Sequence, residues 1–174
     1  MSNYNRTTRE CSVHQLHPKL RQAVQSHFQE HNLGDPEAET LMCCETISEK
    51  KNASGLLSWL KGGADTTIHT GMLLTSQSLI WIRTGDQSGT LLNSANLKEI
   101  HARAYQSVLT KDTGLEIFGL IGSSKGLVNG YVGMGKEEAA QKFCEAVENE
   151  ITKLNPPRKK NKKGLFARWL SPPE

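Results

Sequence analysis

The histidines are the residues whose spacing first suggests chemistry. His27 and His31 lie four residues apart, a spacing at which two imidazoles on one helix can bind the same zinc ion. A zinc site needs further ligands, and the chain has neither an H-E-x-x-H motif nor a C-x-x-C pair. His14 and His17 are three residues apart and equally lack further metal ligands in a recognisable motif. We therefore expect these histidines to lie on a polar helix face, with no metal site.

Two glycine-rich stretches are candidates for phosphate binding, GLIGSSKG at 119–126 and GYVGMG at 130–135. The first lacks the G-K-[ST] order that places a lysine and a hydroxyl on a nucleotide, and the second is not G-x-G-x-x-G. Both are typical of hairpin turns and a strand-to-helix corner. No G-x-S-x-G nucleophile motif occurs either. The sequence therefore predicts no cofactor and no enzyme.

The basic residues gather at the C-terminal end. Residues 155–174 hold six basic residues and one acidic residue, a net charge of +5, while the rest of the chain holds 15 basic and 17 acidic residues, a net charge of −2. The basic residues of this tail are Arg158, Lys159, Lys160, Lys162, Lys163 and Arg168. Positive charge therefore belongs to the tail and not to the predicted folded body.

Aromatic residues follow the basic cluster. Phe166 and Trp169 are three apart and would share one face of a helical turn. A basic cluster beside such a segment is typical of a peripheral membrane anchor, and each basic residue near an anionic surface contributes about 1 kcal/mol. Three alternatives stay open: an inert solvated tail, a peptide that docks on a protein partner or a second copy, and non-specific contact with nucleic acid phosphates.

A second candidate contact site is the stretch GLLSWLKGG at 55–63. Trp59 and Lys61 lie in it, and Lys50 and Lys51 precede it. An exposed tryptophan beside lysines suits a membrane interface or a partner surface. The alternative, which we favour, is a short helix with Trp59 in the core.

Seven segments of strand-like composition must position these residues. They are short, rich in β-branched and aromatic residues, and separated by turn signals, which is typical of a sandwich or barrel. They span 39–51, 65–75, 78–84, 90–93, 97–110, 115–122 and 127–134. Cys43 and Cys44 are adjacent in the first strand and should point to opposite faces.

Two amphipathic helices flank the strands. In 16–33, apolar residues such as Leu20, Val24 and Phe28 recur at helical spacing, and Pro18 suits the first turn. In 136–154 an apolar stripe runs opposite a polar face. The second helix follows the last strand, so it could plug the open mouth of a bent sheet.

Two runs carry a family resemblance. HTGMLLTSQSLIWIR at 69–83 resembles a strand pair of bacterial pleckstrin-homology-like (PH-like) and GRAM-like domains, and GYVGMGKEEAAQKFCEAV at 130–147 resembles their last strand and capping helix. The resemblance implies a mostly β (α+β) fold, a PH-like seven-stranded barrel capped by a C-terminal amphipathic helix, with an additional N-terminal helix. It implies a binding scaffold without naming the ligand. The strand at 65–75 lacks the Lys/Arg pattern of phosphoinositide sites.

The expected organisation has four parts. A flexible N-terminus at 1–15 precedes a helix at 16–33, a PH-like domain at 38–154 and a basic amphipathic tail at 155–174. No apolar leader or span is seen and the four cysteines suit a reduced state, so we expect a cytoplasmic protein, peripheral at the inner face of a membrane. The predicted function is a non-enzymatic binding or scaffolding module recruited to anionic membranes by its tail. The alternative is a protein-interaction or self-assembly domain with the tail as docking peptide.

Overall fold

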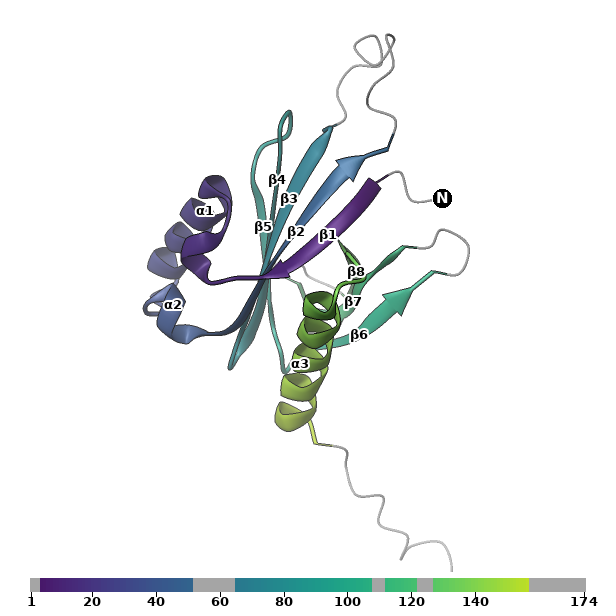
Figure 1. Ribbon diagram of the computed structural model, residues 1–174. Helices are drawn as coiled ribbons and strands as arrows, with labels where there is room; N and C mark the ends of the chain where they lie inside the picture. The colour runs from purple at the N-terminus through teal and green to yellow at the C-terminus, as the bar shows by residue number, and fades with distance from the viewer. Residues whose placement is uncertain (1–3, 52–64, 108–111, 122–126, 157–174) are drawn as a thin grey trace, which may run out of the picture.

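The computed structural model describes residues 4–51, 65–107, 112–121 and 127–156. Figure 1 shows two sheets, a helix pair beside the larger one and a long helix against the smaller one. The strands are β1 (Tyr4–Glu10), β2 (Thr40–Lys50), β3 (Thr67–Thr75), β4 (Ser78–Gly85), β5 (Leu91–Asn96), β6 (Ile100–Gln106), β7 (Thr113–Gly119) and β8 (Val128–Met134). The helices are the 3-10 turn η1 (Val13–Gln15), α1 (Pro18–Glu30), α2 (Pro36–Glu39) and α3 (Glu138–Leu154).

All strand pairs in the described residues are antiparallel. Five strands form one sheet in the order β1-β2-β3-β4-β5, and three form the other in the order β6-β7-β8. The seven predicted strands and both predicted helices are present, and the mostly β class with a C-terminal helix is confirmed. The strands described make two separate sheets and not one closed barrel.

One apolar core lies between the two sheets and α3. The α3 residues Phe143 and Val147 are fully buried there, against Leu115 and Ile117 of β7. The stripe of apolar residues predicted on this helix is therefore its buried face. Burial of this stripe holds the helix in place, because a 17-residue helix has marginal stability alone.

A second apolar core lies on the other face of the five-stranded sheet. Leu20, Val24 and Phe28 of α1 pack there against Leu73 and Ile80. Pro18 opens α1, and the His17 side chain caps it by accepting a hydrogen bond from the Lys19 N–H at 3.3 Å. The helix predicted at 16–33 thus covers a sheet face as a layer of its own.

The adjacent cysteines confirm that the strand separates the two cores. Cys43 belongs to the core on the α1 side and Cys44 to the core on the α3 side. Successive side chains of a strand point to opposite faces. This pair therefore marks β2 as a strand that is buried on both faces.

The prediction of a flexible N-terminus at 1–15 is wrong for its described part, residues 4–15. Residues Tyr4–Glu10 form β1, which pairs with β2 along its whole length, and η1 follows at Val13–Gln15. Polar contacts hold this strand: the buried Thr8 hydroxyl lies 2.8 Å from that of Thr46 and accepts a hydrogen bond from the Gly135 N–H at 2.8 Å. The Thr8 N–H donates to Glu137 at 2.9 Å. Because the strand has almost no apolar face, hydrophobic periodicity could not reveal it.

Candidate binding cleft between α3 and β6

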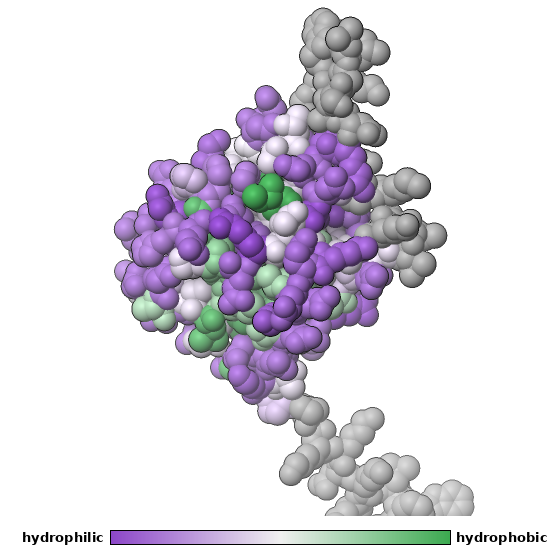
Figure 2. All heavy atoms as spheres, viewed as in Figure 1, coloured by the Kyte–Doolittle hydropathy of each residue, from purple (hydrophilic) through white to green (hydrophobic). Residues whose placement is uncertain are grey.

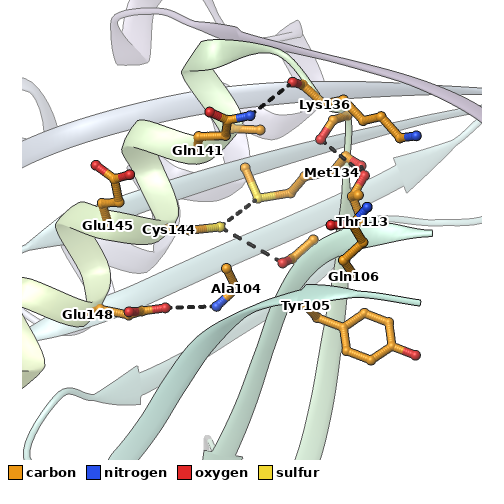
Figure 3. Close-up of a pocket in the computed structure, with 13 residues that line it drawn as sticks. Ala104, Tyr105, Gln106, Thr113, Met134, Lys136, Gln141, Cys144, Glu145 and Glu148 are labelled. Carbon is orange, nitrogen blue, oxygen red and sulfur yellow. Dashed lines mark hydrogen bonds between the residues drawn. The ribbon is translucent and has the colours of Figure 1, made fainter. Parts of the chain in front are cut away.

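An open cleft of about 500 Å³ separates α3 from the ends of the strands of the smaller sheet. Figure 3 shows helix residues on one side of this cleft and strand residues on the other. It is lined by Ala104, Tyr105, Gln106, Thr113, Gly114, Met134, Gly135, Lys136, Ala140, Gln141, Cys144, Glu145 and Glu148. We refer to it as the α3–β6 cleft.

The edge of β6 borders this cleft. The Ala104 N–H donates a hydrogen bond to Glu148 Oε1 at 2.8 Å, so it points away from β7 and toward α3. Main-chain groups alternate in direction along a strand. Ala102 and Gln106 therefore direct their N–H and C=O groups to the same side as Ala104. β6 is the outer strand of its sheet, so the cleft has a strand edge as one wall.

The floor of the cleft is apolar. Met134, Ala140 and Cys144 are buried, and the Cys144 sulfur lies 3.9 Å from the Met134 sulfur and from the Gly114 carbonyl oxygen. Gly114 is required here, because a Cβ on it would lie 2.0 Å from the Val132 carbonyl oxygen. Burial raises the pKa of the Cys144 thiol to about 11, so it is protonated at neutral pH and is no nucleophile.

The rim of the cleft carries carboxylates on its helix side. Glu145 and Glu148 line it one helical turn apart, and Glu148 is partly buried. Lys136 lines the far end, where the Gln141 side chain donates to its carbonyl oxygen at 3.5 Å. A strand edge, an apolar floor and an acidic rim together suit an extended segment that carries basic side chains.

The surface around α3 is mainly polar. Figure 2, which shows the same face as Figure 1, has hydrophilic residues over most of the described surface and hydrophobic ones only in small areas. A large exposed apolar patch would mark a docking site by itself. On this face the described residues offer instead the α3–β6 cleft, where main-chain groups and charged side chains would make the contacts with a bound segment.

Sequence reasoning did not find this cleft. Glu145 and Glu148 fall in the helix predicted at 136–154 and Ala104 in the strand predicted at 97–110, and no motif in the sequence distinguishes them as site residues. The hydrogen bond from the Ala104 N–H to the Glu148 carboxylate joins residues 44 positions apart. No local pattern in the sequence signals such a contact.

The predicted contact residues lie outside the described residues. Trp59 and Lys61 fall in 52–64, and all the tail residues, Arg158 to Trp169, fall in 157–174. Among the described residues, no helix is both long enough and apolar enough to cross a membrane.

His27 is buried on α1, whereas His31, the C-cap residue after the helix, is exposed, so His27 does not lie on the polar face predicted for it. The His27 and His31 ring centroids are 4.3 Å apart, and His31 Nδ1 lies 3.0 Å from the His27 carbonyl oxygen. Burial lowers the pKa of His27, and the neighbouring His31 adds to this effect. Within the described ranges, no group of three His, Cys, Asp or Glu side chains is placed to hold a metal ion.

A second polar cluster lies at the start of α1. Glu45 on β2 is only 2% exposed, and its carboxylate is paired with Arg9 at 2.6 Å and with His69 Nδ1 at 3.1 Å. The His17 ring lies against that of His69, with centroids 4.4 Å apart. Buried charges of this kind are paired because desolvation alone would be costly. The cluster joins β1, β2, β3 and the start of α1.

Comparisons with family models, with curated proteins and with solved structures found no match to this chain. The geometry of the cleft and the composition of the tail therefore carry the functional proposals below.

Proposed function

We propose that the chain is a non-enzymatic binding module, whose α3–β6 cleft binds an extended basic segment of a protein. The seven strands from Thr40 to Met134, in two antiparallel sheets with α3 at one end, support a PH-like relationship for residues 38–154. A fold of this class hosts many functions, so the cleft and not the fold carries the proposal.

The observation that carries it is the contact between Ala104 and Glu148. The Glu148 carboxylate occupies the position that a carbonyl oxygen of an added strand would take on the β6 edge. A carbonyl oxygen of an incoming strand that displaced Glu148 would accept the hydrogen bond from the Ala104 N–H. The displaced carboxylate would then lie beside the side chains of that strand. A lysine or arginine at that point of the segment would then pair with Glu148 and Glu145.

A peptide of residues 156–174 is a suitable probe, since it is basic and models the docking-peptide alternative. Its affinity is measured by fluorescence anisotropy on a chain whose own tail lysines are replaced by glutamine. The double variant Glu145→Gln/Glu148→Gln should weaken binding about tenfold, equivalent to about 1.4 kcal/mol. Glutamine retains a carbonyl oxygen that accepts from Ala104, so the change removes charge and spares the hydrogen bond.

The matched control is Glu150→Gln. Glu150 lies on the same helix, pairs with Lys153 and does not line the cleft. Glu150→Gln removes one negative charge from α3 and the double variant removes two, and the affinity of the Glu150→Gln chain for the peptide should equal that of the parent chain. An equal loss of binding free energy per charge removed in the two variants would mean that the peptide responds only to net charge, and absence of binding would overturn the proposal.

A second function is favoured by the charge asymmetry of the sequence. The tail at 155–174 carries +5 and the remainder −2, so the tail is the part that an anionic bilayer would attract. We propose that it recruits the module to anionic membranes, with Phe166 and Trp169 inserted. Such binding should fall with added salt, because exposed charges are screened within about 8 Å at physiological ionic strength.

Co-sedimentation with vesicles separates this second function from the first. Vesicles of anionic and of purely zwitterionic lipid are compared, using the full chain and a chain with the tail lysines changed to glutamine. The full chain should bind anionic vesicles only, and the variant should not bind. Equal binding by both chains would exclude the tail as the anchor, and binding by neither would exclude membrane recruitment.

A further inference from the structure

Cys11 and Cys43 lie side by side although they are 32 positions apart in the chain. Cys11 continues the register of β1 on β2, in which Glu10 faces Cys44, and its N–H donates to the Cys43 carbonyl oxygen at 3.1 Å. The two sulfur atoms are 3.9 Å apart. Directly opposed residues that share such a hydrogen bond have Cα atoms about 5.5 Å apart, within the range of about 4.4–6.8 Å that a disulfide requires.

The two thiols differ in exposure. Cys11 is partly exposed, whereas Cys43 is 4% exposed and belongs to the core on the α1 side. Both line an open surface cleft of about 490 Å³, bordered by the segment after β1 and by the start of β2. Cys11 therefore presents more of its surface to a small solute in this cleft than Cys43 does.

The two thiols also differ in acidity. A hydrogen bond with the Cys43 thiol lowers the pKa of Cys11, and the positive charge of Arg9 adds to this effect against burial and the nearby carboxylates. The same hydrogen bond and burial raise the pKa of Cys43. Burial raises the pKa of Cys44 to about 12. The buried thiols Cys43, Cys44 and Cys144 are thus disfavoured as the first thiol to attack a peroxide, and Cys11 is favoured for that step.

We propose that Cys11 and Cys43 are a thiol–disulfide redox pair, in which a peroxide oxidises Cys11 and Cys43 then closes a disulfide between β2 and the segment after β1. This site is independent of the α3–β6 cleft and of the tail. It is assigned from a pair of opposed thiols, a cleft that exposes one of them and a partner positioned to resolve it.

The reaction has two steps. The Cys11 thiolate sulfur attacks one oxygen of hydrogen peroxide, the O–O bond breaks, and the released hydroxide takes up a proton, giving a sulfenic acid and water. The Cys43 sulfur then attacks the Cys11 sulfur, the S–S bond forms, the S–O bond breaks, and the hydroxyl leaves with the Cys43 proton as a second water. The two thiols lose two electrons, and the peroxide is reduced to water.

The disulfide would fasten the N-terminal strand. Cys11 links β1, an edge strand held by polar contacts, to η1 and α1. Fastening it to Cys43 would tie the α1 layer to β2. Oxidation should therefore raise the melting temperature of the full chain by several degrees, because the cross-link restricts the unfolded chain.

The test treats the reduced full chain with hydrogen peroxide and maps thiols by mass spectrometry of a non-reducing digest. We expect the loss of two hydrogen atoms in mass and a link between the peptides of Cys11 and Cys43, reversed by dithiothreitol. Cys44→Ser should form the same link, since Cys44 is the neighbour of Cys43 on the other face of β2. A link through Cys44 or Cys144, links between molecules alone, or no thiol loss would overturn the proposal.

Two further variants keep the order of events testable. Cys43→Ser should stop the reaction at a Cys11 sulfenic acid, trapped by dimedone, and Cys11→Ser should leave the Cys43 thiol unreacted. Cys11 is only partly buried, so the second variant should disturb the core less than the first. Reaction of Cys43 in the Cys11→Ser chain at the parent rate would show that Cys11 is not the attacking thiol.

Discussion

The two sheets differ in how much of each is covered. The five-stranded sheet has a core on both faces, and the last six residues of β3 are all buried. The three-stranded sheet has a core on one face, and Tyr105, Phe118 and Tyr131 remain exposed on its strands. A sheet that is covered on both faces can contact a partner only through its edge strands. Among the described residues, the smaller sheet is thus left with an uncovered face and with the edge that borders α3.

Removal of a large side chain from the shared core is the strongest test of this difference. Phe143 is 0% exposed in the core between the sheets, and Phe118 is 46% exposed on the smaller sheet. Phe143→Ala should lower the free energy of unfolding by about 3–5 kcal/mol. Phe118→Ala should change it by about 0.5 kcal/mol or less. Urea denaturation measures both, and similar losses would contradict the assignment of a single covered face.

A substitution on the α1 side tests whether the larger sheet truly has two cores. Leu20→Ala should cost about 2–5 kcal/mol, because Leu20 is fully buried under α1. Leu91→Ala on the exposed part of β5 is the matched control. Both chains should unfold in one transition, since the two cores share β2, β3 and β4. A separate early transition in the Leu20 variant would show that α1 is a peripheral layer.

The polar anchoring of β1 should have a smaller effect. Thr8→Val keeps the shape of the side chain but removes a hydroxyl that Thr46 and Gly135 share, so the free energy of unfolding should fall by about 1–3 kcal/mol. Thr7 lies next to it on the exposed face of the same strand. Thr7→Val should therefore be close to neutral in the same urea experiment, and an equal loss would mean that β1 has no buried anchor.

The smallest effect concerns pH. Burial lowers the pKa of His27 in the folded chain, so the unfolded chain binds more protons as pH falls through the ordinary histidine value of about 6.5. Stability is therefore fully present above that pH and declines below it. His27→Gln should flatten this decline between about pH 7 and 5, whereas His101→Gln on an exposed position should not. The urea midpoint of each chain is measured across this pH range. If the midpoints of both variants fell with pH as steeply as that of the parent chain, the idea would be contradicted.

Most of the fold could be predicted because its elements have regular apolar patterns. The strand at 65–75 and the helix at 136–154 show such patterns clearly. β1 could not be predicted in this way, since Thr8 is the only residue of YNRTTRE that is buried. The prediction of a flexible N-terminus was therefore wrong for a specific physical reason: polar pairing with β2 and Glu137 replaces apolar burial.

The candidate sites were less predictable than the fold. The α3–β6 cleft depends on a hydrogen bond between Ala104 and Glu148, and the thiol pair depends on β1 bringing Cys11 beside Cys43. Both contacts join residues far apart in sequence. The tail and the Trp59 stretch remain predictions from composition alone.

Amide hydrogen exchange of the β6 edge tests the binding proposal most directly. Ala102, Ala104 and Gln106 direct their N–H groups toward α3, and the neighbours Arg103 and Tyr105 direct theirs toward β7. Addition of the 156–174 peptide to the chain with neutralised tail lysines should slow exchange at Ala102 and Gln106 while Arg103 and Tyr105 stay unchanged. Unaltered exchange along β6 at saturating peptide, or protection confined to another part of the molecule, would contradict a cleft that binds an added strand.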